Sequence, residues 1–219
     1  MKKSLVLILS LMLLSISSFA QLQKGNLLLG GNVNFQTSST ESDNLGVAGG
    51  NTAKSNSFSI SPLVGYFLSD RTVLGVKVNY FSSKTENLIL AGPSVIFEND
   101  QIGLGPFVRR YFPVKDWVAF YGQAEVNYGS ARHFQTNNSN SSSETKTRSV
   151  NFAASLGLSF FPTKWMSIDV SVHPLSFSSQ KNQNTSGGAS GSETTTNGFN
   201  LNLNSNSLSL GAHFFLNKK

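Results

Sequence analysis

Apolar and polar residues alternate along much of the chain, and the clearest case is the segment 117–128. In it Phe120 and Val126 share one parity, whereas Gln123 and Glu125 take the other. A period of two is the pattern of a β-strand with one apolar and one polar face. A strand that crosses a bilayer at a tilt needs about 9–11 residues, whereas soluble strands average about 5–6. The length of this segment therefore predicts a membrane-spanning strand.

Eight segments share this pattern, and they predict eight strands. They cover 25–36, 57–68, 72–81, 101–112, 117–128, 148–161, 165–177 and 205–216. Two irregularities stand out. Pro62 cannot donate a hydrogen bond within the second segment. Phe199 and Leu201 have the opposite parity to the last segment, which a bulge or turn around 204–206 would reconcile.

The connections between the segments alternate strictly in length. Short turns are expected at 69–70, 113–116 and 162–164, and long polar loops at 37–56, 82–100, 130–147 and 178–198. This alternation gathers the turns at one rim and the loops at the other, as in transmembrane barrels with short periplasmic turns and long extracellular loops. The prediction is an all-β fold, an eight-stranded antiparallel transmembrane up-and-down β-barrel. Both termini are then expected on the periplasmic side.

The four predicted loops differ in composition. Residues 135–147 and 178–198 are rich in Asn, Ser, Thr and Gly, which predicts mobile extracellular segments. The loop 82–100 instead contains two apolar runs, at 88–90 and 95–97. These runs favour a strand extension beyond the membrane over a cap on the barrel mouth.

The N-terminus has the pattern of a secretory signal. Lys2 and Lys3 precede an apolar run at 5–14, and small residues at 18–20 form a cleavage site. We therefore expect a signal peptide at 1–20 and a barrel at 21–219. An uncleaved anchor is the alternative, but the run is shorter than the roughly 20 residues of a spanning helix. Export past an inner membrane, together with the predicted barrel, predicts a location in the outer membrane of a Gram-negative bacterium.

Composition narrows the function further. The formal charge of +6 is spread along 219 residues, and only 13% of them are charged. Nucleic-acid binding would need a clustered basic patch, so no nucleic-acid partner is expected. The chain has no cysteine, which excludes disulfides and a lipidated N-terminal cysteine.

Six charged or titratable residues are predicted to point into the lumen: Lys77, Arg109, Glu125, Asp169, His173 and His213. An eight-stranded barrel has an interior just wide enough for side chains to fill, and charges there must pair. We predict a structural ion network in which Arg109 pairs with Glu125 across the hairpin. A selectivity site along a conduction path is the alternative.

His173, Asp169 and Ser171 share one face of a predicted strand and are residue types that a hydrolase uses. A lipid-modifying hydrolase needs a histidine base, a serine nucleophile and an orienting acid. These residues point inward, and Ser is abundant in the chain, so no catalytic site is predicted. No metal-ligand spacing or cofactor fingerprint is present, so no metal or cofactor site is expected either.

Aromatic residues concentrate near the predicted turns, where rings are expected at the headgroup level. The predicted girdle consists of Tyr66, Phe112, Trp117, Phe160 and Trp165. Arg110 has lipid-facing parity beside a turn, from which its side chain can reach the headgroups.

The strand count, the unequal rims and the signal peptide resemble the small outer-membrane β-barrel family, the OmpA-barrel and OmpX-like proteins often called porin-family barrels. The local piece that carries the resemblance is 105–112, Gly-Pro-Phe-Val-Arg-Arg-Tyr-Phe. The family commonly ends on an aromatic residue, whereas here Phe214 and Phe215 lie a few residues before the end. The resemblance implies a bare barrel assembled by the barrel-assembly machinery.

Three functions are considered. The first is a non-enzymatic envelope protein with a filled lumen, whose loops meet an extracellular ligand or surface or support envelope integrity. The second is a small porin-like diffusion or transport barrel. The third, less favoured, is a lipid-modifying enzyme. Outer-membrane lipid and lipopolysaccharide are the expected surroundings, and a monomer is the expected state.

Overall fold

The computed structural model describes residues 22–42, 51–89, 94–137, 142–184, 193–201 and 209–217. The predicted signal peptide at 1–20 and the predicted bulge at 204–206 lie outside these ranges. Within them, no helix is long and apolar enough to span a membrane.

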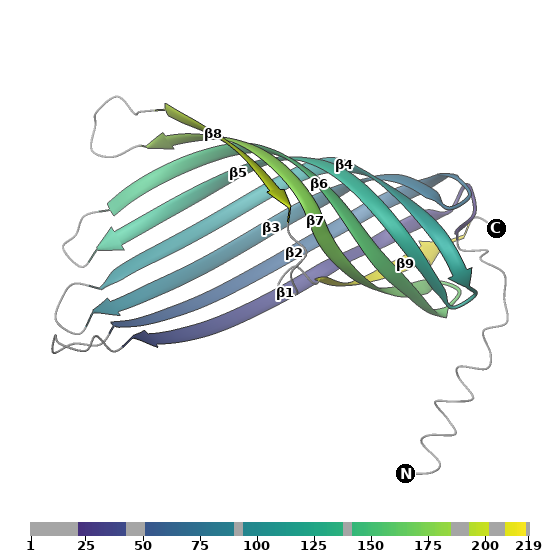
Figure 1. Cartoon of the computed structure of the whole chain (residues 1–219), viewed down its shortest axis with the longest axis horizontal. Helices are drawn as coiled ribbons and strands as arrows, with labels where there is room; N and C mark the ends of the chain where they lie inside the picture. The colour runs from purple at the N-terminus through teal and green to yellow at the C-terminus, as the bar shows by residue number, and fades with distance from the viewer. Residues whose placement is uncertain are drawn as a thin grey trace, which may run out of the picture.

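The described chain is almost entirely β-strand. The strands are β1 (Leu27–Ser42), β2 (Asn51–Ser69), β3 (Thr72–Ile89), β4 (Val95–Lys115), β5 (Val118–Asn137), β6 (Ser142–Thr163), β7 (Met166–Asn184), β8 (Glu193–Leu201) and β9 (Ser209–Leu216). Each pairs antiparallel with its neighbours, and β1 closes the ring by pairing with β9 (Figure 1). The predicted all-β fold is confirmed, because β8 and β9 share one place in a ring of eight.

The shared place of β8 and β9 explains the break in parity near the C-terminus. Both pair with β7, β9 up to Ser171 and β8 from Leu175 onward. Phe199 of β8 and Leu210 of β9 have opposite parity, yet both face outward, with 69% and 66% of their surface exposed. The two outward-facing sets of opposite parity therefore lie on two separate strands, β8 and β9, as the break in parity indicates.

The strands are longer than the alternating pattern predicted, and the prediction of long loops is wrong. Most of the residues assigned to loops belong to strands, because the backbone pairing of the hairpins continues through them. Some Ser, Thr and Asn side chains also pair across neighbouring strands there. Thr37 Oγ1 donates to Asn56 Oδ1 at 2.6 Å, and Thr147 Oγ1 donates to Asn182 Oδ1 at 2.7 Å. The preference for a strand extension at 82–100 is confirmed, since β3 runs to Ile89 and β4 starts at Val95.

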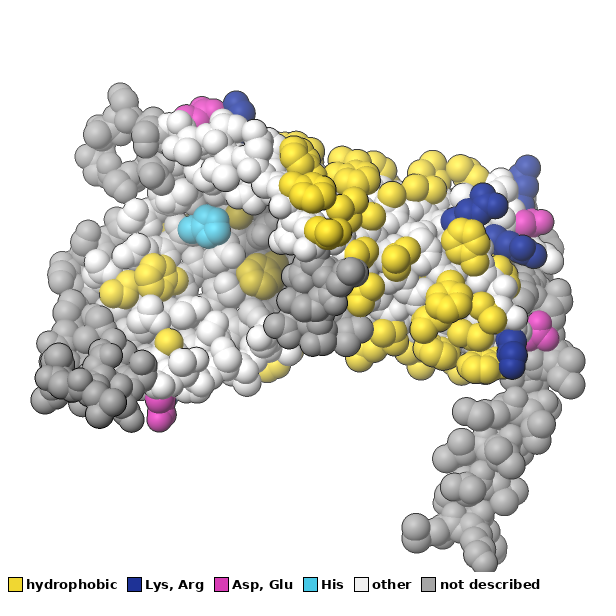
Figure 2. All heavy atoms as spheres, in the orientation of Figure 1, with side chains coloured by type: hydrophobic (Ala, Val, Ile, Leu, Met, Phe, Trp, Pro, Cys, Tyr) yellow, Lys and Arg dark blue, Asp and Glu magenta, His cyan; other side chains and the backbone are white. Residues whose placement is uncertain are grey.

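A band of outward apolar side chains surrounds the part of the barrel near the short turns (Figure 2). We call that end the turn end; it contains the connections β2–β3, β4–β5 and β6–β7. In β2 the band runs from Phe58 to Leu68. At about 3.3 Å per residue and a tilt of about 40°, this stretch spans about 25–30 Å, the height of a bilayer core.

Aromatic residues line both edges of this band. At the turn end Trp117 stacks on Phe160 with ring centroids 6.3 Å apart, and Trp165 stacks on Phe214 at 5.9 Å. The far edge has a second ring of exposed aromatic side chains, which the sequence analysis missed. It consists of Phe35, Phe58, Tyr80, Tyr128, Phe152, Phe177 and Phe199. We call the strand parts beyond this ring the outer half and the rest the turn half.

The hydrophobic core fills the barrel at its turn end. It consists of Leu22, Leu28, Leu63, Phe67, Val73, Phe107, Tyr111, Ala119, Tyr121, Phe161 and Phe215. Leu22 precedes β1 and is held in place by its carbonyl oxygen, which accepts a hydrogen bond from the Arg71 backbone at 2.7 Å. The Gly25 backbone also donates to the Phe67 oxygen at 2.9 Å. The N-terminal segment thereby closes the turn end.

Candidate functional site

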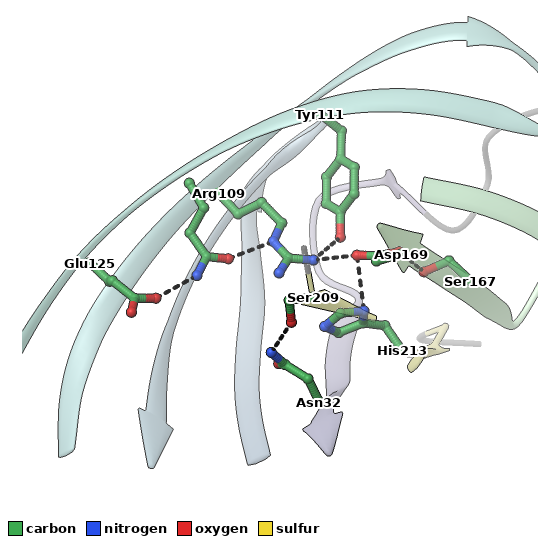
Figure 3. Close-up of polar contacts among 9 residues, drawn as sticks. Asn32, Arg109, Tyr111, Glu125, Ser167, Asp169, Ser209 and His213 are labelled. Atoms are coloured by element: carbon green, nitrogen blue, oxygen red, sulfur yellow. Dashed lines mark hydrogen bonds and ion pairs between the residues drawn. The ribbon is translucent and has the colours of Figure 1, made fainter. Parts of the chain in front are cut away.

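Five charged or titratable side chains meet inside the barrel, next to the hydrophobic core. Lys77 comes from β3, Arg109 from β4, Glu125 from β5, Asp169 from β7 and His213 from β9. Strand alternation directs each of them inward, and Arg109, Asp169 and His213 are at most 4% exposed. The lumen at this level is therefore crossed by side chains from five strands, and Figure 3 shows Arg109, Glu125, Asp169 and His213 among them.

Arg109 and Asp169 form the most buried ion pair of this network. Arg109 Nη1 lies 2.9 Å from Asp169 Oδ2, and Ser167 Oγ donates to Asp169 Oδ1 at 2.8 Å. The guanidinium also donates to Tyr111 Oη at 3.1 Å and lies 4.2 Å from the centroid of the Tyr121 ring. Such extra hydrogen bonds are what a buried ion pair needs to offset the desolvation of its charges.

A second ion pair is joined to the first through Gln123. Lys77 Nζ lies 2.9 Å from Glu125 Oε2. Arg109 Nε donates to Gln123 Oε1 at 2.7 Å, and Gln123 Nε2 donates to Glu125 Oε2 at 2.7 Å. Two cations and two carboxylates thus form one continuous, charge-balanced network.

The predicted pairing of Arg109 with Glu125 is wrong. Arg109 lies opposite Gln123 in the register of β4 and β5, whereas Phe107 lies opposite Glu125. The lumen is narrow enough for the Arg109 guanidinium to reach Asp169 on β7, across the barrel. Gln123 takes the intermediate position between Arg109 and Glu125.

His213 completes the network on the side of β9. Its Nδ1 lies 3.0 Å from Asp169 Oδ2, but neither ring nitrogen makes a well-aligned hydrogen bond to another described residue. In Figure 3 the imidazole lies between Asp169 and the hydrogen-bonded pair of Asn32 and Ser209, whose Nδ2 and Oγ are 2.6 Å apart. The adjacent cavity has a volume of about 20 Å³, room for about one water molecule.

The three residues of a hydrolase type that share one strand face, Asp169, Ser171 and His173, do not form an accessible catalytic site. His173, Ser171 and Asp169 line the same small cavity. The carboxylate of Asp169 is engaged by Arg109, Ser167 and His213. A cavity of this size has no room for a lipid substrate. Among the described residues, no group of three or more His, Cys, Asp or Glu is placed to hold a metal ion.

The sequence analysis missed four polar members of the network: Tyr111, Tyr121, Gln123 and Ser167. All four have the inward parity of their strands, which was the available signal. The predicted girdle residues Tyr66, Phe112, Trp117 and Trp165 are all on the outer surface, with 43% to 55% exposed, and Phe160 stacks on Trp117.

Electrostatic contacts outside the membrane band are weaker and solvent-exposed. Lys181 Nζ lies 3.1 Å from Glu193 Oε1 between β7 and β8, and this hydrogen bond lowers the pKa of Glu193. Lys84 lies 3.3 Å from Glu86, whose hydrogen bond raises the pKa of the lysine. Exposed pairs of this kind contribute little to stability.

The family model described as "Outer membrane protein beta-barrel domain" matches residues 6–214. Among solved structures, OprG from Pseudomonas aeruginosa has a TM-score of 0.53 at 14% identity and covers 90% of this chain and 98% of its own. At this identity the likeness shows the fold alone.

Two further solved structures are similar over most of the chain. Ail, the attachment invasion locus protein of Yersinia pestis, has a TM-score of 0.39 at 15% identity and covers 89% of this chain and 100% of its own. Neisserial surface protein A has a TM-score of 0.39 at 19% identity, with 87% and 97% covered. No curated protein sequence matches.

Proposed function

The chain belongs to the family of outer membrane protein β-barrel domains, and from this premise we propose that it is a non-enzymatic envelope protein with a closed lumen. In this role the turn half is a rigid anchor in the outer membrane of a Gram-negative bacterium. The outer half carries a β-sheet wall beyond the membrane, which meets an extracellular ligand or surface.

The observation that carries this proposal is the two-layer filling of the turn half. The first layer is the apolar core, in which Phe67, Tyr111 and Phe215 pack with ring centroids 6.1 to 6.4 Å apart. The second layer is the ion network of Lys77 and Arg109 with their carboxylates. A solute would have to displace both layers to cross, which disfavours the porin-like alternative.

The outer wall supports the second half of the proposal. β8 is exposed along its whole length, and β1 is exposed from Val33 to Glu41. The strands there carry Ser, Thr and Asn on both faces, so water and polar partners have access to them. This wall, rather than long loops, is the surface that we propose for interaction.

The proposed orientation puts the turn end and both termini in the periplasm. Residues 1–20 then act as the export signal, as their charge and hydropathy pattern predicts. The exposed, outward ring of Phe214 in β9 is a candidate for recognition by the barrel-assembly machinery. Lipopolysaccharide is the lipid that the outer wall would adjoin.

Single-channel recording of the refolded protein in a planar bilayer tests the proposal. A closed lumen predicts no stable conductance steps. As a matched comparison, Tyr111→Ala opens the core and Arg109→Ala opens the network, and the double variant is expected to show the larger leak. Reproducible steps from the unmodified protein would contradict the closed lumen and favour the diffusion barrel.

A further inference from the structure

The outward face of the turn half contains an apolar groove of about 480 Å³ across β5, β6 and β7. Phe112 on β4 forms one wall. The other strands contribute Phe120 from β5, Leu156 and Leu158 from β6, and Val170 and Val172 from β7. The groove faces away from the lumen, because these residues share the outward parity of their strands.

A missing side chain produces the groove. Gly122 occupies a lipid-facing position directly opposite Leu156 in the register of β5 and β6. A Cβ atom added to Gly122 would meet only Leu156 Cδ2, at 3.9 Å, so the space in front of it is open. The floor is closed from behind, since the Tyr121 ring packs against Gly157. The wall is therefore hollowed at this point without opening into the lumen.

A cation lies at the edge of the groove. Arg110 is exposed, has outward parity and is directly opposite Gly122 in the register of β4 and β5. Its guanidinium carbon lies 5.9 Å from the centroid of the Phe112 ring, which is itself part of the groove wall. Within the described part of the chain, Arg110 has no carboxylate partner.

We propose that this groove binds one glycerophospholipid, with an acyl chain in the hollow at Gly122 and the phosphate on Arg110. A guanidinium recognises phosphate through charge-assisted hydrogen bonds, which are stronger than neutral ones. An apolar groove with a cation beside it matches the amphipathic character of such a lipid. The groove lies beside the turn-end girdle, so the choice of leaflet rests on the orientation under the proposed function.

Native mass spectrometry of the detergent-extracted protein, titrated with phosphatidylglycerol, tests this inference. The unmodified protein is expected to retain one lipid. Arg110→Gln removes the phosphate contact, and Gly122→Leu fills the hollow while keeping the charge. Arg110→Gln is expected to weaken binding about tenfold, the usual effect of losing one charge-assisted contact. Gly122→Leu is expected to weaken binding by a similar factor, because its side chain occupies the space of the acyl chain. Gly122→Ala, which adds a single methyl group, should have a smaller effect.

Two variants on the same surface are matched controls. Lys164→Gln removes an exposed turn-end cation, and Ala212→Leu adds bulk to the outward face of β9, which is not part of the groove. Both are expected to bind phosphatidylglycerol as the unmodified protein does. A heat-dependent shift in gel migration checks that every variant is folded.

Equal binding by all variants would overturn the inference, because retention would then be ordinary contact with bulk lipid. Equal loss in the controls would overturn it as well, since binding would not depend on the groove. If the protein bound lipid A more tightly than phosphatidylglycerol, and Arg110→Gln lost this preference, the groove would bind lipid A and not a glycerophospholipid. That result would also contradict the proposed orientation of the barrel. None of these outcomes bears on the closed lumen, which the conductance recording tests separately.

Discussion

The turn half and the outer half of the barrel are built from the same strands, with the same antiparallel hydrogen bonds, and yet they differ in what fills them. Along β4, the inward residues from Gly103 to Tyr111 are all buried, whereas Asn99 and Gln101 are only half-buried. β8 has no buried residue at all. Backbone pairing is thus common to both halves, and side-chain packing is confined to one.

This difference indicates where the stability of the molecule resides. Truncating a core side chain, or removing one partner of a buried ion pair, costs several kcal/mol, whereas losing an exposed polar pair costs little. Substitutions in the turn half should therefore be costly, and comparable substitutions in the outer half should be tolerated.

The largest effect is expected from Asp169→Ala. It leaves the Arg109 guanidinium in the lumen without its carboxylate, which typically costs about 3–5 kcal/mol. The measurement is the free energy of unfolding in urea with lipid vesicles present. Asp100→Ala, an exposed aspartate on the same sheet, is the control and should change this energy by less than about 0.5 kcal/mol. Equal losses of unfolding free energy in Asp169→Ala and Asp100→Ala would contradict the difference between the two halves.

Phe107→Ala should have a similar or slightly smaller effect. Phe107 is 1% exposed within the core, and truncation of a buried phenylalanine costs about 3–5 kcal/mol. Phe97→Ala, on the same strand in the outer half, removes a ring that is 40% exposed. The same unfolding measurement should show a clearly smaller change there, and an equal change would mean that the outer half is packed too.

Val126→Arg is predicted to cost about 1–2 kcal/mol. Val126 faces lipid two residues from the far aromatic ring, and the penalty for arginine falls from about 2–4 kcal/mol at mid-depth to about 0–1 kcal/mol near the interface. Val126 faces outward within the apolar band and is 45% exposed. Thr136→Arg changes an outward residue on the same strand beyond the band and should leave the free energy of unfolding nearly unchanged. Tolerance of arginine at both positions would place Val126 outside the membrane.

Deletion of 182–196 should have the smallest effect. It removes the distal pairing of β7 with β8, including the exposed contact between Lys181 and Glu193. It keeps the pairing of Leu175 with Leu201 near the membrane. The shortened protein is expected to fold into vesicles and to show the same heat-dependent gel shift. Failure to fold would mean that the outer half takes part in barrel assembly.

Much of the turn half was predictable from the sequence, because strand alternation has a fixed period. Parity alone sends Lys77, Arg109, Glu125, Asp169 and His213 inward, and it sends the apolar band outward. Parity does not determine which inward charges meet, since that depends on the closure of the ring and its diameter. The contact of Arg109 with Asp169, from β4 to β7, has a sequence separation of 60 residues and no local signal.

The outer half was predicted less well, for a physical reason. Its Ser, Thr and Asn residues lack an apolar face, so alternation gives no signal there, and polar composition suggested loops. These residues form strands because they continue hairpins that the turn half has already aligned. The register of β6 and β7 shifts between the pairs Leu156–Val172 and Ala154–Leu175. Pro174 lies in this stretch and cannot donate to the ladder, so this irregularity did have a signal in the sequence.

Hydrogen–deuterium exchange of the protein in lipid nanodiscs tests the contrast most directly, because β4 supplies both halves on one strand. The backbone amides of 103–111, which flank buried inward side chains, should be protected for hours or longer, and those of 95–101 should exchange at least about a hundredfold faster. A uniform rate along the strand would contradict the account, since it would mean that both halves are packed alike.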